Sequence, residues 1–143
     1  MGRTRKDAIV LVGTRVHGWL YRRSGGRIGG RLAASPVLLL TTRGRRTGRV
    51  RTTPLLYLAD GDRLVIVASY GGDDRPPAWY RNIRADPEVT VEVGRSRRWM
   101  RAADAVGEER ARLWERLTQM YPPYDDYQAR TSRQIPVVVL TPR

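Results

Sequence analysis

The chain contains a series of short apolar runs, each bounded by glycine, proline or charged residues. Runs of this length with turn residues at their ends are typical of β-strands. The expected strands cover residues 36–42, 52–58, 63–69, 88–93, 97–103 and 135–140. Two helices are expected among them, over residues 78–84 and 107–120. About six strands with few helices predict a mainly β fold of the α+β kind, a small barrel with helices packed at its edge.

The N-terminal segment differs from the rest of the chain. Apolar side chains near helical spacing predict a helix over residues 7–22, and a glycine-rich linker follows over residues 27–31. A chain of 143 residues is expected to form one domain. We therefore expect a helix and linker over residues 1–31 and a barrel that binds a cofactor over residues 32–143. The absence of a signal-peptide pattern and of an apolar run of about 20 residues favours a cytoplasmic protein.

The residue types exclude several kinds of chemistry. The chain has no cysteine, and His17 is its single histidine. Disulfides, thiolate metal sites and cysteine nucleophiles are therefore excluded, and a histidine metal cluster or a Ser-His-Asp triad is not expected. No metal site is predicted.

The connection between the first two expected strands carries the strongest functional signal. Residues 41–54 hold five arginines and two glycines, in a chain whose net charge is +13 and whose basic residues, apart from Lys6, are all arginine. Arginines crowded on a tight turn repel one another unless an anion binds there, and guanidinium groups match phosphate and carboxylate. The segment therefore predicts an anion site. The alternative is a solvated basic hairpin, in a protein whose arginine content reflects a GC-rich coding bias.

Further motifs follow in order, at residues 51–55, 67–69, 77–82, 120–128 and 133–137. Together with residues 36–48 they resemble the deazaflavin-dependent nitroreductase family, the coenzyme F420-dependent quinone and nitro reductases. The resemblance implies a split β-barrel related to FMN-binding proteins. It also implies an oxidoreductase that transfers hydride from reduced coenzyme F420 to a quinone, a nitro compound, or an activated alkene or carbonyl.

The resemblance implies a cofactor site built from several segments. Coenzyme F420 carries a phosphate and a polyglutamate tail, and the resemblance places these anionic groups near Arg45, Arg46, Thr47 and Arg51. The rest of the cofactor would contact a strand, the end of the next strand, a helix and a tyrosine. These residues are Thr52, Thr53, Pro54, Leu55, Leu56, Val67, Ala68, Ser69, Tyr70, Ala78, Trp79, Tyr80, Arg81, Asn82 and Tyr124.

The candidate catalytic residues are four residues that carry hydroxyl groups. Negative charge develops on an oxygen of the acceptor, and hydroxyl donors from Ser69, Tyr121, Tyr124 and Tyr127 would stabilise it. Each has a purely structural alternative. A serine at a strand end often bonds to backbone, and tyrosines at i, i+3 spacing often only pack together. Trp79, likewise, is as well suited to a core as to a cofactor wall.

The expected partners follow from charge and from the resemblance. The acceptor is a small molecule, a quinone above all, and the protein is a monomer or a weak homodimer.

Leu56 stands where members that reduce nitroimidazoles can have tyrosine, and Tyr70 stands where relatives often have lysine. Residues 1–31 are basic and partly amphipathic, so they either contact an anionic membrane peripherally, at the inner face of the cell membrane, or cover the pocket.

A different reading of the same charge is a basic small barrel that binds FMN or nucleic acid without F420 chemistry. FMN carries a phosphate but no polyglutamate tail, so it needs fewer arginines. The aromatic residues are not interleaved with a basic stripe of the kind on which bases stack, so no specific nucleic acid is expected.

Overall fold

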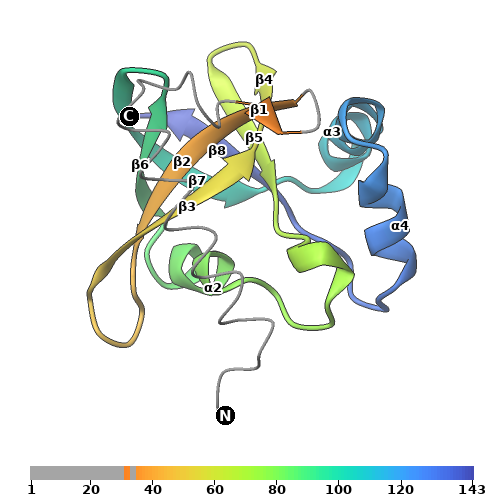
Figure 1. Cartoon of the computed structure of the whole chain (residues 1–143), viewed down its shortest axis with the longest axis horizontal. Coiled ribbons are helices and arrows are strands. Elements are labelled where there is room, and N and C mark those ends of the chain that lie inside the picture. Colours follow the sequence, from red (N-terminus) through yellow and green to blue (C-terminus); the bar gives the residue numbers. More distant parts are fainter. Residues whose placement is uncertain (1–30, 33–34) are drawn as a thin grey trace.

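The computed structural model describes residues 31–32 and 35–143 (Figure 1), so the helix expected over residues 7–22 lies outside the described residues. The elements in chain order are β1 (Arg31–Leu32), β2 (Ser35–Arg43), β3 (Val50–Leu56), β4 (Leu58–Asp60), β5 (Arg63–Val67), the 3-10 turn η1 (Tyr70–Gly72), α2 (Ala78–Ala85), β6 (Glu88–Val93), β7 (Ser96–Asp104), α3 (Gly107–Met120), α4 (Pro123–Ala129) and β8 (Val137–Pro142). Within these residues, no helix is long and apolar enough to cross a bilayer.

The strands form one antiparallel sheet that curves into an open barrel. Its order is β1-β2-β6-β7-β8-β5-β4, and β3 pairs with β2 beside this path. The hairpin of β2 and β3 crosses the front of the sheet in Figure 1. The split β-barrel expected from the resemblance is confirmed.

One face of the sheet packs around α2. Alternate residues of β2, β5, β6, β7 and β8 point to this face, as the two-residue period of a strand requires. They form the inner cluster with two residues of α2, Trp79 and Ile83. The members from the strands are Leu38, Leu40, Leu64, Ile66, Val89, Val91, Met100, Ala102, Val138 and Leu140.

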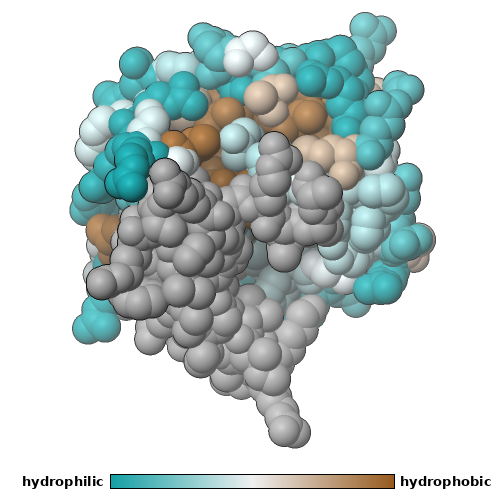
Figure 2. All heavy atoms as spheres, turned by 45° about the horizontal axis from the view of Figure 1, so that its top comes forward, coloured by the Kyte–Doolittle hydropathy of each residue, from teal (hydrophilic) through white to brown (hydrophobic). Residues whose placement is uncertain are grey.

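The other face of β5 and β8 is covered by α3 and α4. Val65 and Val67 of β5 and Val137 and Val139 of β8 form an outer cluster there, with residues of both helices. Both strands are therefore buried on two faces, which explains why their sequences are continuous apolar runs. On the face drawn in Figure 2, hydrophilic side chains surround a smaller apolar area.

Most of the expected elements are confirmed, and β6 and α3 have the expected bounds. The strand expected over residues 52–58 was wrong at its end. It stops at Leu56, and residues 58–60 pair with β5 instead. The last strand begins at Val137 rather than at residue 135. The short β1 and β4 raise the number of described strands above the expected six.

Asp60 connects the end of β4 to α3. Its side chain is 15% exposed and accepts hydrogen bonds from Arg63 on β5 and from Arg112 and Arg116 on α3. The hydrogen bonds from Arg112 and Arg63 are the main reason that the pKa of Asp60 lies far below its usual range. One carboxylate thus holds α3 against the β4–β5 hairpin.

We expect Asp60→Asn to destabilise the fold by only about 1 kcal/mol at neutral pH, because the arginine side chains are partly exposed and solvent screens the interaction. Since the pKa of Asp60 is lowered in the folded state, its contribution is complete above the unfolded pKa of about 4 and is lost as the pH falls below it. Urea unfolding of both proteins from pH 7 to pH 3 measures this. A stability difference that does not shrink in acid would contradict the assignment.

Candidate functional site

Of the arginine-rich residues 41–54, residues 44–49 form the tip of the hairpin between β2 and β3, and we call them the arginine loop. The N–H of Gly44 donates to the carbonyl of Arg49 over 2.7 Å, and the N–H of Gly48 donates to the carbonyl of Gly44 over 2.8 Å. Gly48 has a φ of 71°, which favours glycine. The side chains of residues 45–49 are exposed. The loop is therefore a tight turn that presents its arginines to solvent.

Asn82 of α2 holds this loop in place. Its Oδ1 accepts from the backbone N–H and from Nη1 of Arg45, both over 3.2 Å, and its Nδ2 donates to Oγ1 of Thr42 over 3.1 Å. The residue is 4% exposed. This buried amide makes three hydrogen bonds, which join α2 to the loop and to β2 at this point.

The electrostatics of the loop favour an anion. Desolvation lowers the pKa of Arg45, and the positive charges of Arg46 and Arg81 lower it further. In the part of the chain that the structure describes, none of these three arginines forms an ion pair with a carboxylate. Their mutual repulsion is therefore uncompensated, and a bound anion would relieve it. The described residues contain no group of His, Cys, Asp or Glu that could hold a metal ion.

The strand β3 leads away from the loop with its residues half-buried. Leu55 packs against the inner cluster and Leu56 against the outer one. Because side chains alternate along a strand, Arg51 and Thr53 share the face of Leu55, whereas Thr52 and Pro54 share the face of Leu56. Oγ1 of Thr52 lies 2.9 Å from Oγ1 of Thr41 on the neighbouring strand. The five residues expected along the cofactor thus divide between two faces of β3.

The segment after β5 divides in a similar way. The side chain of Val67 is buried in the outer cluster and that of Ala68 in the inner one. Ser69 and Tyr70 follow them, are half-buried and begin η1. The hydroxyl of Ser69 forms no capping hydrogen bond with η1. Tyr70 has a φ of 47°, which is unusual for a residue with a side chain.

The residues expected to form a cofactor wall on α2 lie in different surroundings. Trp79 is 5% exposed and belongs to the inner cluster. The hydroxyl of Tyr80 donates to Asp104 of β7 over 2.6 Å. Ala78 is exposed. Only Asn82, through its bonds, and Arg81, through its charge, are linked to the arginine loop.

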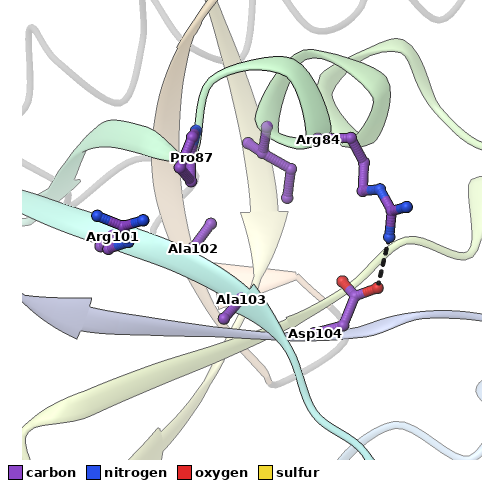
Figure 3. Close-up of a pocket in the computed structure, with 7 residues that line it drawn as sticks. Arg84, Pro87, Arg101, Ala102, Ala103 and Asp104 are labelled. Carbon is purple, nitrogen blue, oxygen red and sulfur yellow. Dashed lines mark hydrogen bonds and ion pairs between the residues drawn. The ribbon is translucent and has the colours of Figure 1, made fainter.

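A cavity of about 310 Å³ lies between α2 and β7. Figure 3 shows the residues that line it, with the ion pair between Arg84 and Asp104 at its edge. The lining consists of Ile83, Arg84, Pro87, Arg101, Ala102, Ala103 and Asp104. None of the residues expected to bind the cofactor or to act in catalysis lines it, so the cavity is separate from the candidate site.

The three expected tyrosines come together beside the outer cluster. The hydroxyls of Tyr121 and Tyr127 lie 3.3 Å apart, and the ring of Tyr124 is 4.9 Å from that of Tyr121 and 6.3 Å from that of Tyr127. Tyr124 is 4% exposed, whereas the other two are half-buried. Leu56, at the end of β3, packs against the same cluster.

The tyrosines are held in the neutral form. The hydrogen bond with Tyr127 and burial raise the pKa of Tyr121 to about 12. Burial, together with the neighbouring Tyr121 and Tyr127, raises the pKa of Tyr124 even further. Both hydroxyls are therefore hydrogen-bond donors at neutral pH and very weak acids.

Two residues in this region received no role from the sequence. Thr42 accepts a bond from Asn82, and Arg133 donates to backbone carbonyls of residues 68 and 69. Thr42 lies on the largely apolar strand β2, and its hydroxyl is the feature of the sequence that could have indicated a buried polar contact there. Arg133 lies in the motif of residues 133–137, before β8 begins at Val137, and its type alone does not identify the groups that it binds.

Comparison with known proteins identifies the family. A model of the F420H(2)-dependent quinone reductase family matches residues 13–142. The chain is 47% identical over 133 residues to an F420H(2)-dependent quinone reductase of Mycobacterium tuberculosis. This match covers 90% of this chain and 89% of that protein.

Solved structures agree with this result. An F420-H2 dependent reductase is 39% identical, with a TM-score of 0.69, over 73% of this chain and 93% of its own. A protein described as a domain-swapped dimer is 35% identical, with a TM-score of 0.71, over 88% of this chain and 96% of its own. The chain therefore belongs to the F420H(2)-dependent quinone reductase family, whose cofactor is reduced coenzyme F420.

Proposed function

We propose that this protein transfers hydride from reduced coenzyme F420 to a quinone, in a site that extends from the arginine loop to the tyrosines. The observation that carries the proposal is a group of three guanidiniums, on Arg45, Arg46 and Arg81, that has no carboxylate partner within the described residues and in which Arg45 is held by Asn82. A group of this kind is preorganised for the anionic end of a cofactor.

The residues present fit the cofactor. Arg45, Arg46, Thr47 and Arg51 would hold its phosphate and polyglutamate tail, with guanidinium groups that match both. When bound, reduced coenzyme F420 supplies the hydride, and the protein supplies binding and orientation. The seven residues of β3 extend over about 20 Å, which suits an elongated ligand whose tail and reactive ring lie far apart.

The far end of β3 suits the acceptor. Leu56, Tyr121 and Tyr127 all pack against the outer cluster, and the hydroxyls of the two half-buried tyrosines would donate hydrogen bonds to the oxygen of a quinone. Ser69, which has no capping bond, is a further donor. Because the pKa of Tyr121 is raised to about 12, it donates without losing its proton, and solvent would supply the proton that the product needs.

Tyr124 has a different role in the proposal. Its ring is buried between Tyr121, Tyr127 and Trp114, so it supports the two accessible hydroxyls more than it contacts the acceptor. Nitro compounds are a second class of acceptor. We do not expect nitroimidazoles among them, because Leu56 lacks the hydroxyl that tyrosine would supply there.

A peripheral contact with an anionic membrane remains part of the proposal. The segment that suggested it, residues 1–31, lies almost entirely outside the described residues. A separate observation supports it: Trp99 on β7 is 64% exposed and lies among the exposed Arg97, Arg98 and Arg101. A tryptophan within a basic surface suits a headgroup region.

The cofactor anchor can be tested by replacing Arg45, Arg46 and Arg51 together with alanine. We expect binding of coenzyme F420 to weaken about 10²-fold or more, because hydrogen bonds between charged groups contribute about 1.5–3 kcal/mol each. The control replaces Arg95, Arg97 and Arg98, which removes the same charge from the end of β7. Isothermal titration of both variants decides, and equal affinities would contradict the anchor.

The acceptor end can be tested with Tyr121→Phe and Tyr127→Phe. We expect unchanged cofactor affinity and kcat/KM for a quinone lower by about tenfold, the loss of one donor. Tyr57→Phe, at a half-buried tyrosine of the inner cluster, is the control. Because Tyr121 ionises only well above neutral pH, its ionisation should not change the kcat/KM of the wild-type protein up to about pH 9. Phenylalanine variants with full activity would exclude these hydroxyls from the reaction.

The membrane contact can be tested by co-sedimentation with vesicles of phosphatidylglycerol. We expect binding that salt weakens and that Trp99→Ala reduces several-fold, since the indole would no longer insert. Uncharged phosphatidylcholine vesicles are the control. Equal recovery with both lipids would remove the membrane from the proposal.

A further inference from the structure

The side chain of Arg133 makes an unusual set of hydrogen bonds. Its Nε donates to the carbonyl of Asp73 over 2.9 Å, and its Nη1 donates to that of Ala68 over 3.2 Å. Its Nη2 donates to the carbonyls of Ser69 and Arg75, over 2.8 and 3.4 Å. One half-buried guanidinium thus binds four carbonyls of a single loop, residues 68–75.

This loop has a backbone conformation that needs support. Tyr70, Gly71 and Gly72 follow one another with φ of 47°, 65° and 82°. Left-handed backbone is unfavourable for a tyrosine, and such residues persist where the surroundings hold them. The carbonyls that Arg133 binds lie on both sides of these three residues. The guanidinium therefore closes the turn that they form.

The same loop is attached to the end of α4. A Cβ on Gly72 would lie 2.7 Å from the carbonyl oxygen of Tyr127, so the loop backbone approaches α4 as closely as glycine allows. Nη1 of Arg130 donates to the carbonyl of Gly71 over 3.4 Å, and Oγ1 of Thr131 donates to Asp74 over 2.8 Å. The loop that carries Ser69 and the helix that carries Tyr127 are thus in direct contact.

Arg133 is itself fixed to α4. Nε2 of Gln128 donates to the carbonyl of Arg133 over 2.7 Å, and Oε1 of Gln128 accepts from the N–H of Ile135 over 2.9 Å. The amide of Gln128 therefore sets the position of the backbone from which the guanidinium extends. A change at Arg133 would reach the loop without altering the tyrosines.

We propose that Arg133 is a positioning residue, which holds the loop of Ser69 and Tyr70 in the shape that cofactor binding requires and joins it to the tyrosine helix α4. This inference rests on the proposed function, in which Ser69 and Tyr70 lie beside the cofactor and Tyr127 beside the acceptor. Arg133 keeps these two sides of the site in one arrangement while it contacts neither ligand.

The decisive variant is Arg133→Lys, with Arg110→Lys as the matched control. Lysine keeps the charge but carries its donors on one nitrogen, so it cannot bind four carbonyls at once. Arg110 of α3 is also half-buried and donates to a carbonyl, that of Ile135 over 2.6 Å, but it makes no bond to the loop. Both variants therefore lose a buried arginine, and only one releases residues 68–75.

Two readouts test the proposal. In the cofactor-free protein, hydrogen exchange of the amides of residues 69–75 should become about tenfold faster in Arg133→Lys and stay unchanged in Arg110→Lys. The Kd for coenzyme F420 should rise about tenfold in Arg133→Lys alone. Exchange and Kd within about twofold of wild type would overturn the positioning role.

A second variant covers the case in which Arg133→Lys does not fold. Gly72→Ala keeps Arg133 but pushes the loop away from Tyr127, and it should raise loop exchange and the Kd in the same way. Wild-type values for both readouts would again overturn the inference. If wild-type protein itself fails to bind coenzyme F420, the proposed function is wrong. If wild type binds and neither variant changes the Kd, the positioning role alone is wrong.

Discussion

The burial of β5 and β8 on both faces is the constraint on which the rest of the structure depends. Their alternate residues belong to two separate clusters, so each face needs its own cover. One cover is α2, which inserts Trp79 and Ile83 into the open barrel. The other is the pair α3 and α4, which bring Leu113, Leu117 and Tyr124 to the opposite face. Both ends of the candidate site come from elements that the core itself requires.

This arrangement explains why the site has two chemically different ends. Because α2 must fill the barrel, it brings the buried Asn82 to the arginine loop, where the amide oxygen of Asn82 accepts hydrogen bonds from Arg45. Because α4 must cover the outer face, Tyr124 and Tyr127 lie there beside Tyr121, against the outer cluster on which Leu56 of β3 also packs. The strand β3 connects the two ends. Charge is concentrated at one end, while hydroxyls with raised pKa values lie at the other.

Much of the fold could be predicted from local patterns. The alternation of residues 88–93 and the apolar stripe of residues 107–120 are signals carried by neighbouring residues, and both elements have the expected bounds. The three residues of β4 are too few for a pattern, and their pairing with β5 ended the preceding strand earlier than expected. The tight turn of the arginine loop could be recognised because its arginines and glycines are adjacent in sequence.

The contacts that organise the candidate site could not be predicted in this way. The bond between Asn82 and Thr42 joins residues 40 positions apart, and those from Arg133 to the loop span 58 to 65 positions. Such contacts depend on how the barrel closes, which no local pattern records. The same holds for Trp79, which packs in the core, and for Tyr80, which bonds to Asp104. Two adjacent aromatic residues look the same in a sequence whether they make these contacts or bind a cofactor.

The central claim is that the arginine loop selects a cofactor with a phosphate and an acidic tail. The most direct measurement is a side-by-side titration of the purified protein with coenzyme F420 and with FMN, followed by addition of a quinone to the complex with reduced coenzyme F420. We expect coenzyme F420 to bind at least about tenfold more tightly than FMN, because its tail makes additional charged hydrogen bonds, and we expect the quinone to reoxidise it. A protein that is purified with FMN, or that binds both cofactors equally, would contradict the account.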